Sequence, residues 1–295
     1  MLFRSGNRHD WVGRCFMEHP HGRVGVFEAG AGFELWAAFQ RHRSGDAVIA
    51  PVLLPDEHFQ RRHNTLNSAF TFKLQRHPPR GLSASKKMYN RLRHDLDPTR
   101  GRRALWHLYR GARRTVQRTI RKPLARFRFA RDKVRVNVMV RAEQAPNRDS
   151  RITLSPKRDA LGVPQSTLDW RMSMVDKRSV RIASEGLARS FEAAGMGRMH
   201  LSEWLYDDSP EWPLDLTVGN HAIAGYHHIG TTRMSQEPEY GVVDPDCRVH
   251  GYDNLFVAGS SVFPTSSWAN PTLTLLALAY RLADHLNEQT RSNRL

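Results

Sequence analysis

The sequence is poor in cysteine and has no long apolar run. Its two cysteines, Cys15 and Cys247, lie far apart in 295 residues and in no metal-ligand spacing. Neither a disulfide framework nor a zinc module is therefore predicted. The N-terminus has no apolar stretch of the signal-peptide type, and the longest apolar run, LTLLALAY at 273–280, is too short to cross a bilayer. These absences predict a soluble chain and give no signal from which to assign a compartment.

Acidic residues are also scarce, because 29 Asp and Glu stand against 45 Lys and Arg, which gives a formal net charge of +16. Between Arg100 and Arg135, fourteen basic residues accompany the single acid Asp132, so this stretch alone contributes +13. Within it, residues 103–121 place apolar side chains at helical spacing among arginines, which predicts a basic amphipathic helix. Such a helix suits an acidic protein or a membrane surface. Nucleic acid is disfavoured, because no recognisable nucleic-acid module accompanies the helix.

The remaining pattern predicts an α+β fold, in which an antiparallel sheet is flanked by helices. The 40% of hydrophobic residues is enough to bury cores. Residues 177–195 predict an amphipathic helix that ends at Gly195, where a left-handed cap is easiest to adopt. Alternating or clustered β-branched and aromatic residues predict strands, and the segments are 22–32, 46–54, 69–74, 133–144 and 254–259.

Two patterns resemble known binding sites, but the neighbouring residues argue against both. GVFEAGAGFELWAAF has the strand, glycines and helix-like stretch of a dinucleotide fingerprint, but Leu35 stands where close packing needs Gly or Ala. A glycine-bent antiparallel strand is the preferred interpretation. HPHG at 19–22 could be combined with His227 and His228 as metal ligands, but no i, i+4 pair or nearby carboxylate supports this. No metal site is predicted.

Three segments near the C-terminus occur in a fixed order: YHHIGTTRM at 226–234, DPDCRVHGYDNLFVAGSSVFPT at 244–265, and ANPTLTLLALAYRLADHL at 269–286. The last predicts a buried helix with Asn270 as N-cap and Pro271 at the first helical position. The N-terminus of such a helix can hold an anion or an electron-rich ring edge. Adjacent side chains point in different directions, so His227 and His228 are expected to have different roles.

These three segments together resemble the C-terminal portion of the glucose-methanol-choline (GMC) family of FAD-dependent oxidoreductases. The resemblance is dense over 226–286 and weaker over 12–27 and 143–171. It implies an internal piece of the FAD-binding domain at 1–25, a substrate-binding domain at 26–215 and a closing segment of the FAD domain at 216–295. The family's N-terminal glycine fingerprint is missing. The chain therefore looks like the C-terminal half of a longer enzyme, and its closing segment should expose apolar surface.

The resemblance also implies site residues. Gly230 and Thr231 match the H-x-x-G-T motif of the family, which makes His227 the catalytic base and leaves His228 at a variable position. Asn270 takes the place of the family's second catalytic residue. The residues implied to bind FAD are Ala258, Gly259, Ser260, Asn270, Pro271 and Thr272.

The implied reaction is the oxidation of an alcohol or sugar-type CH–OH group, with FAD as hydride acceptor. A neutral imidazole can take the hydroxyl proton, whereas Asn can only hydrogen-bond the oxygen. The implied partners are a small-molecule alcohol and either an electron-acceptor subunit or the missing N-terminal half. The alternative is a non-catalytic truncated product or a docking subunit that uses residues 103–121 on an acidic or membrane surface. The sequence names neither the alcohol nor the electron acceptor.

Overall fold

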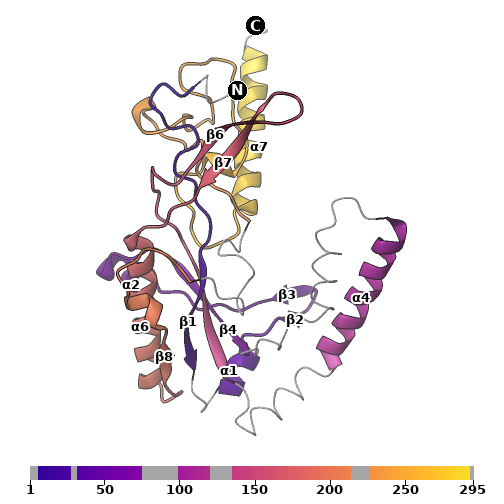
Figure 1. Ribbon diagram of the computed structural model, residues 1–295, viewed down its shortest axis with the longest axis vertical. Coiled ribbons are helices and arrows are strands. Elements are labelled where there is room, and N and C mark those ends of the chain that lie inside the picture. Colours follow the sequence, from indigo (N-terminus) through magenta and orange to yellow (C-terminus); the bar gives the residue numbers. More distant parts are fainter. Residues whose placement is uncertain (1–5, 28–31, 75–98, 120–134, 214–225, 293–295) are drawn as a thin grey trace.

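A computed structural model of the chain describes residues 6–27, 32–74, 99–119, 135–213 and 226–292 (Figure 1). Its central feature is a four-stranded sheet in the order β4-β5-β1-β8, with every neighbouring pair antiparallel. The strands are β1 (His21–Phe27), β4 (Ser68–Leu74), β5 (Val136–Ala142) and β8 (Met199–Leu201). Helices and two separate hairpins complete the described structure. The predicted α+β class is confirmed.

The sheet forms where the apolar pattern is strongest. The central strand β5, VNVMVRA, is buried at every position except Arg141. β1 is paired antiparallel on both edges and carries a bulge between Arg23 and Gly25, so it is the glycine-bent strand that the sequence favoured. At Gly25 a Cβ atom would lie 2.5 Å from the backbone oxygen of His200, so only glycine fits. The strand ends at Phe27, and α1 (Gly32–Ala38) begins within the segment predicted to be extended.

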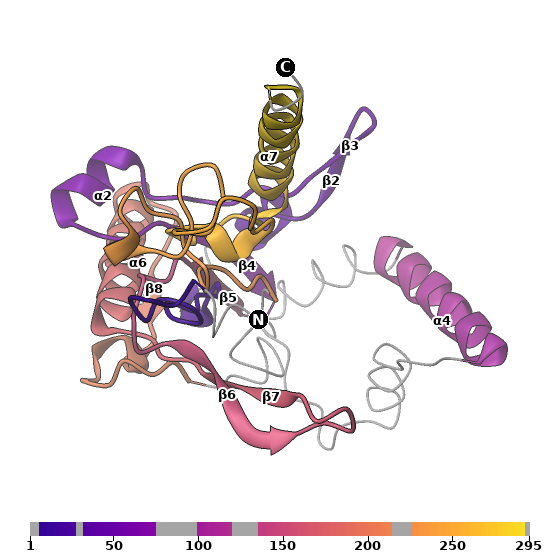
Figure 2. The same cartoon turned by 90° about the horizontal axis from the view of Figure 1, so that it is seen from above.

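Helix α6 (Met174–Ala193) packs against β5 and β8. It begins with a capping box between Ser173 and Asp176, and Gly195 follows its end with φ of +65°. The prediction of a helix closed by Gly195 is confirmed, although the helix starts three residues earlier than expected. The basic amphipathic helix is α4 (Arg100–Thr119), and it stands apart from the rest of the described chain in both views (Figures 1 and 2).

Two predicted strands are wrong in extent. Of residues 46–54, only β3 (Ala47–Ile49) is a strand, paired with β2 (His42–Ser44), because Pro51 has no N–H to continue the ladder. Residues 254–259 make one isolated bridge, between Phe256 and Arg248, instead of a strand. The partner residue Arg248 lies in a short stretch between two turns, which leaves no room for a longer ladder.

The hairpin of β6 (Arg151–Arg158) and β7 (Pro164–Asp169) was not predicted, because its side chains are largely exposed and show no clear alternation. Its turn is stabilised by Asp159, whose carboxylate accepts from the backbone N–H groups of Leu161 and Val163, both at 2.9 Å. The remaining elements are α2 (Glu57–His63) and three short 3-10 helices, Glu203–Tyr206, Pro238–Tyr240 and Ser260–Val262.

The C-terminal helix α7 (Thr272–Ser292) differs from the prediction of a buried helix. Among its residues, all of which the structure describes, only Leu282 is buried. Leu273 and Tyr280 are 81% and 71% exposed, because no described segment covers that face. The exposed apolar surface expected of an isolated closing segment is therefore present. No helix in the described residues is long and apolar enough to span a membrane.

Buried apolar residues form two separate clusters. The first lies around the sheet and α6, and its members fall between Val24 and Trp212. The second joins residues 11–17 to residues 229–282 and includes Trp11, Met17 and Ile229. The predicted boundaries after residues 25 and 215 stay a prediction.

Candidate functional site

The loop that carries YHHIGTTRM is held by segments distant in sequence. Met17 and Ile229 exchange two backbone hydrogen bonds, of 2.9 and 3.1 Å, and Thr232 N–H donates to the Ser261 carbonyl at 2.9 Å. Gly230 adopts φ of +94°, and a Cβ there would lie 2.3 Å from the carbonyl oxygen of Cys15. Glycine is required at this position because both the backbone conformation and the close approach exclude a side chain.

The two adjacent histidines have different partners, as expected. The His228 ring lies 5.3 Å from the Phe16 ring, and its Nδ1 is 3.3 Å from a carboxylate oxygen of Glu18. The His227 ring instead meets the His19 ring edge-on, with centroids 5.2 Å apart. His227 therefore lies beside a buried histidine, and His228 pairs with a buried carboxylate.

Arg141 brings the two predicted catalytic residues together. One terminal nitrogen of its guanidinium donates to Asn270 Oδ1 at 2.7 Å, and the other lies 2.7 Å from His227 Nδ1. Arg141 was not predicted from the sequence. The available signal was one arginine inside the apolar run VNVMVRA, at a position where a surface charge would interrupt a buried strand.

The contact with Arg141 fixes the protonation of the His227 ring. A guanidinium has only donors, so Nδ1 must accept, and the proton of the neutral ring must lie on Nε2. Burial, and after it the charge of Arg141, lower the pKa of His227. The ring is therefore held neutral, with its only free nitrogen protonated.

The two neighbouring buried histidines are also kept uncharged. Burial, followed by the charge of Arg141, lowers the pKa of His19 to about 4 and that of His21 to about 3. Burial also raises the pKa of the Glu18 carboxyl, against the opposing effect of the His19 backbone N–H. Arg141 is consequently the charged group beside these two neutral histidines.

A buried polar network fixes the chain just before Asn270. Ser266 Oγ bonds the backbone of Gln144, accepting from its N–H at 3.0 Å and lying 3.1 Å from its carbonyl oxygen. The side-chain oxygen of Gln144 accepts from the backbone N–H of Glu18 at 3.0 Å and from Trp170 Nε1 at 2.9 Å. This network connects the end of β5, the segment before His19 and the loop that leads to α7.

The residues predicted to bind cofactor lie on this face of the protein. Ser260 Oγ donates to the carbonyl of His228 at 2.7 Å, which places residues 258–260 beside the histidine loop. Gly259 has φ of +132°, and there is no atom within 4 Å of its Cβ position. Ala258 and Thr272 are exposed, and Pro271 is half-buried.

Helix α7 begins one residue later than predicted. Thr272 is its first residue, and the carbonyl of Pro271 accepts from Leu275 N–H at 2.8 Å. The Asn270 side chain does not serve as the predicted N-cap, because its oxygen is bonded to Arg141. Asn270 nevertheless shares Arg141 with His227, and Ser260 is bonded to the residue after His227.

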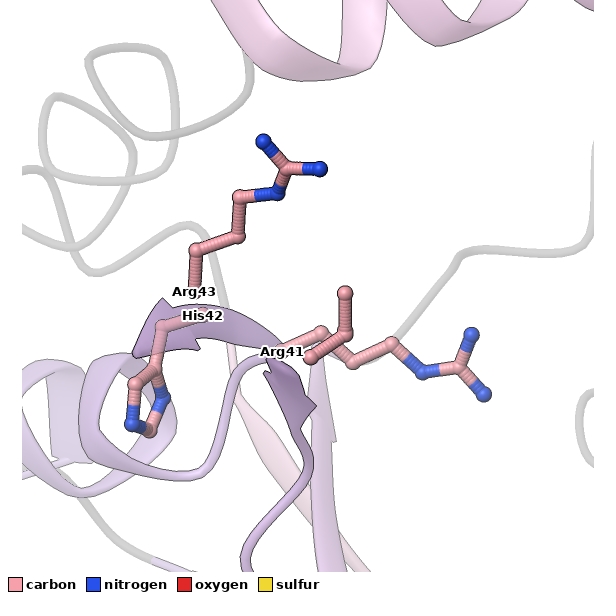
Figure 3. Close-up of a pocket in the computed structure, with 4 residues that line it drawn as sticks. Arg41, His42 and Arg43 are labelled. Carbon is pink, nitrogen blue, oxygen red and sulfur yellow. The ribbon is translucent and has the colours of Figure 1, made fainter. Parts of the chain in front are cut away.

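A hollow of about 540 Å³ lies on the β2–β3 hairpin and shares no residue with this cluster (Figure 3). It is lined by Arg41, His42, Arg43 and Val48, all of which are exposed. The side chains of Arg41 and Arg43 extend in different directions and do not converge on a common point (Figure 3). Among the described residues, no group of three or more His, Cys, Asp or Glu side chains could hold a metal ion.

Comparison with known proteins matches part of this chain to a class of oxidoreductases. Residues 146–279 match the family model described as GMC oxidoreductase. The C-glycoside 3-oxidase of Arthrobacter globiformis is 33% identical over 135 residues, which are 45% of this chain and 23% of that protein. The fructose dehydrogenase large subunit of Gluconobacter japonicus is 28% identical over 150 residues, 50% of this chain and 24% of that protein.

A solved structure, pyridoxine 4-oxidase from Mesorbium loti, is similar over 95% of this chain and 44% of its own, with a TM-score of 0.44 and 16% identity. The chain spans about a quarter of the length of the curated relatives it matches. The match to the GMC oxidoreductase family covers residues 146–279, less than half of the chain, and it lies in the C-terminal region of that family. The resemblance carried by YHHIGTTRM and NPTLT is confirmed.

Proposed function

We propose that this chain provides the catalytic face of an FAD-dependent oxidoreductase that oxidises the CH–OH group of an alcohol or sugar-type substrate. The observation that carries the proposal is the convergence of His227 and Asn270 on one guanidinium, each at 2.7 Å. The two residues come from loops far apart in sequence, and a common hydroxyl oxygen would need both within hydrogen-bond reach. The match of residues 146–279 to the GMC family supports the reaction class.

The residues present fit the flavin end of FAD. Gly259 combines a positive φ with open space at its Cβ position, so a bound ring system could approach the backbone there. The exposed N-terminus of α7 has free backbone N–H groups and a partial positive charge, which favour negative charge on a nearby ring edge. When bound, FAD would supply the hydride acceptor. The residues proposed to hold it are Ala258, Gly259, Ser260 and residues 270–272.

His227 and Asn270 have different roles toward the substrate hydroxyl. Because Asn270 Oδ1 accepts from Arg141, the amide NH₂ of Asn270 is left to donate a hydrogen bond to the substrate oxygen. His227 accepts the hydroxyl proton, which requires a ring nitrogen without a proton. The contact with Arg141 must therefore be released before His227 can act, since it holds the proton on Nε2.

The test begins with the protein purified from its source cells, whose intact mass and flavin absorbance are measured together. We expect bound FAD, and we expect H227A to slow reduction of the flavin by at least about 100-fold, the usual contribution of a general base. Arg43→Ala, in the exposed hairpin, is the control and should leave reduction unchanged. Absence of flavin from the purified protein, or unchanged reduction in H227A, would contradict the proposal.

The second candidate function is docking through α4 onto an acidic or membrane surface, and it can coexist with catalysis. It is favoured by the exposure of Leu105 and Leu108, which lie three residues apart on this basic helix. The double variant L105S/L108S should bind phosphatidylserine vesicles more weakly than the unmodified chain in co-sedimentation. L161S, at an exposed leucine of the β6–β7 turn, is the matched control. Equal binding by both variants would argue against the helix.

A further inference from the structure

The cation at the centre of the candidate site, Arg141, forms no ion pair with any residue that the structure describes. The two terminal nitrogens of Arg141 are bonded to neutral groups, and its Nε is buried with no hydrogen-bond partner. Among the described residues, no carboxylate forms an ion pair with Arg141; Glu18 affects it only through space. A partly buried guanidinium without a counter-ion is costly, because burial removes water without replacing its interactions.

Some of the surrounding buried ring nitrogens also make no hydrogen bond of normal geometry with the part of the chain that the structure describes. His19 is fully buried and lies edge-on to His227, and neither of its ring nitrogens makes a hydrogen bond of normal geometry. Nε2 of His21 is likewise buried and unpaired. Buried polar atoms are normally satisfied, so unpaired atoms grouped around a cation indicate a place for a polar ligand. The N-terminus of α7, two residues after Asn270, adds a partial positive charge.

We propose that Arg141 is a specificity-determining residue that binds the carboxylate of a small 2-hydroxy acid, whose oxidation yields a 2-oxo acid. A carboxylate matches the paired, coplanar N–H groups of a guanidinium, and such bidentate pairs are among the strongest hydrogen-bonded contacts in proteins. This inference names the substrate class of the proposed oxidoreductase and rests on that proposed function.

The short distances set the position of the hydroxyl relative to the carboxylate. Each terminal nitrogen of Arg141 lies 2.7 Å from the atom of His227 or Asn270 that it contacts. A ligand that bonds Arg141 through its carboxylate and these two residues through its hydroxyl must therefore carry both groups within a few ångströms. Adjacent carbons satisfy this condition, whereas a hydroxyl at the far end of a longer acid does not.

Binding of the carboxylate also explains how His227 becomes a base. When the guanidinium turns to the carboxylate, Nδ1 of His227 loses its donor, and the ring can carry its proton on either nitrogen. His227 then takes the hydroxyl proton, the carbinol C–H bond breaks, a C=O bond forms, and the two electrons leave with the hydride to the flavin of the proposed function. Without an anionic ligand, the hydrogen bond from Arg141 occupies the Nδ1 lone pair, so the neutral ring of His227 has no free nitrogen with which to accept the proton.

The first test measures binding by the 295-residue chain without flavin. Calorimetry is carried out with glycolate, which has both groups, acetate, which lacks the hydroxyl, and ethylene glycol, which lacks the carboxylate. We expect glycolate to bind more tightly than acetate, and ethylene glycol to bind more weakly than either. R141Q should weaken glycolate binding by at least about tenfold, and R141K should weaken it less, because Lys keeps the charge but loses the paired donors. R43Q is the control with unchanged affinity.

The second measurement follows the ring nitrogens of ¹⁵N-labelled histidine by NMR. Glycolate should change the Nδ1 signal of His227 in the unmodified chain, and it should leave that signal unchanged in folded R141Q. Far-UV circular dichroism shows whether each variant is folded. If R141Q is unfolded, R141K replaces it in both measurements. Equal affinities for glycolate and ethylene glycol, or full glycolate affinity in folded R141Q or R141K, would overturn the inference. Flavin retention and its reduction by a neutral alcohol would survive that result, so failure of this inference is distinguishable from failure of the proposed function.

Discussion

Replacement of Gly230 by alanine separates two physical effects at the histidine loop. At φ of +94° an alanine adopts an unfavourable backbone conformation, which destabilises the folded state by about 1–2 kcal/mol. Its Cβ would also lie 2.3 Å from the Cys15 carbonyl oxygen, about 1 Å closer than such atoms approach. Displacing backbone within a packed core adds about 1–3 kcal/mol. We therefore expect G230A to lower the free energy of unfolding by about 2–5 kcal/mol.

The matched control is G251A. Gly251 also has a positive φ, of +81°, but there is no atom within 4 Å of its Cβ position. This variant should lose only the conformational part, about 1–2 kcal/mol. Urea unfolding, followed by tryptophan fluorescence, gives both values. Because the two replacements differ in the clash alone, equal losses for G230A and G251A would refute the argument that the Cys15 contact requires glycine.

Three further predictions concern the buried groups. The pKa of His19 falls from 6.5 in the unfolded chain to about 4 in the folded one, so the unfolded state binds more protons between these two pH values. Acidification from pH 6.5 to 4 should therefore lower the free energy of unfolding by on the order of 3 kcal/mol. In urea titrations, H19F should show a free energy of unfolding that depends less on pH. D207A should destabilise the chain by about 2–4 kcal/mol because it leaves the ammonium of buried Lys177 without its carboxylate, whereas in the K177M background the same change should cost little. L282A should cost about 2–4 kcal/mol in the same assay, while L273Q should leave stability unchanged and reduce self-association in sedimentation velocity.

The sequence predicted the elements whose burial is indicated by their own apolar pattern. β5 and α6 carry long apolar patterns, and both were expected, with small errors at their ends. The β6–β7 hairpin was missed, since a strand exposed on both faces lacks the alternation that identifies strands. Burial of α7 was wrong for a different reason. Its apolar composition describes a helix covered on all sides, but coverage depends on other segments and is not a property of the helix itself.

The candidate site likewise has one part that the sequence predicted and one part that it did not. The spacing of His227, Gly230 and Thr231 identified the loop, and the loop's shape follows from a glycine that no other residue can replace. Arg141 could not be found by spacing, because it lies 86 residues from His227 and 129 from Asn270. Only pairing of β5 with β1 and β4 brings it to the site.

The position of Arg141 relative to the two cores links the geometry of the site to their packing. Arg141 belongs to the sheet of the first core, whereas His227 and Asn270 lie on loops bordering the second. The same junction is crossed by the bonds between Gln144 and Ser266, at 3.0 and 3.1 Å. A shift of one core against the other by about 1 Å would therefore lengthen the 2.7 Å contacts beyond normal hydrogen-bond distances. Because those contacts decide which nitrogen of His227 carries the proton, the basicity of the ring depends on the packing between the two cores as well as on its own loop.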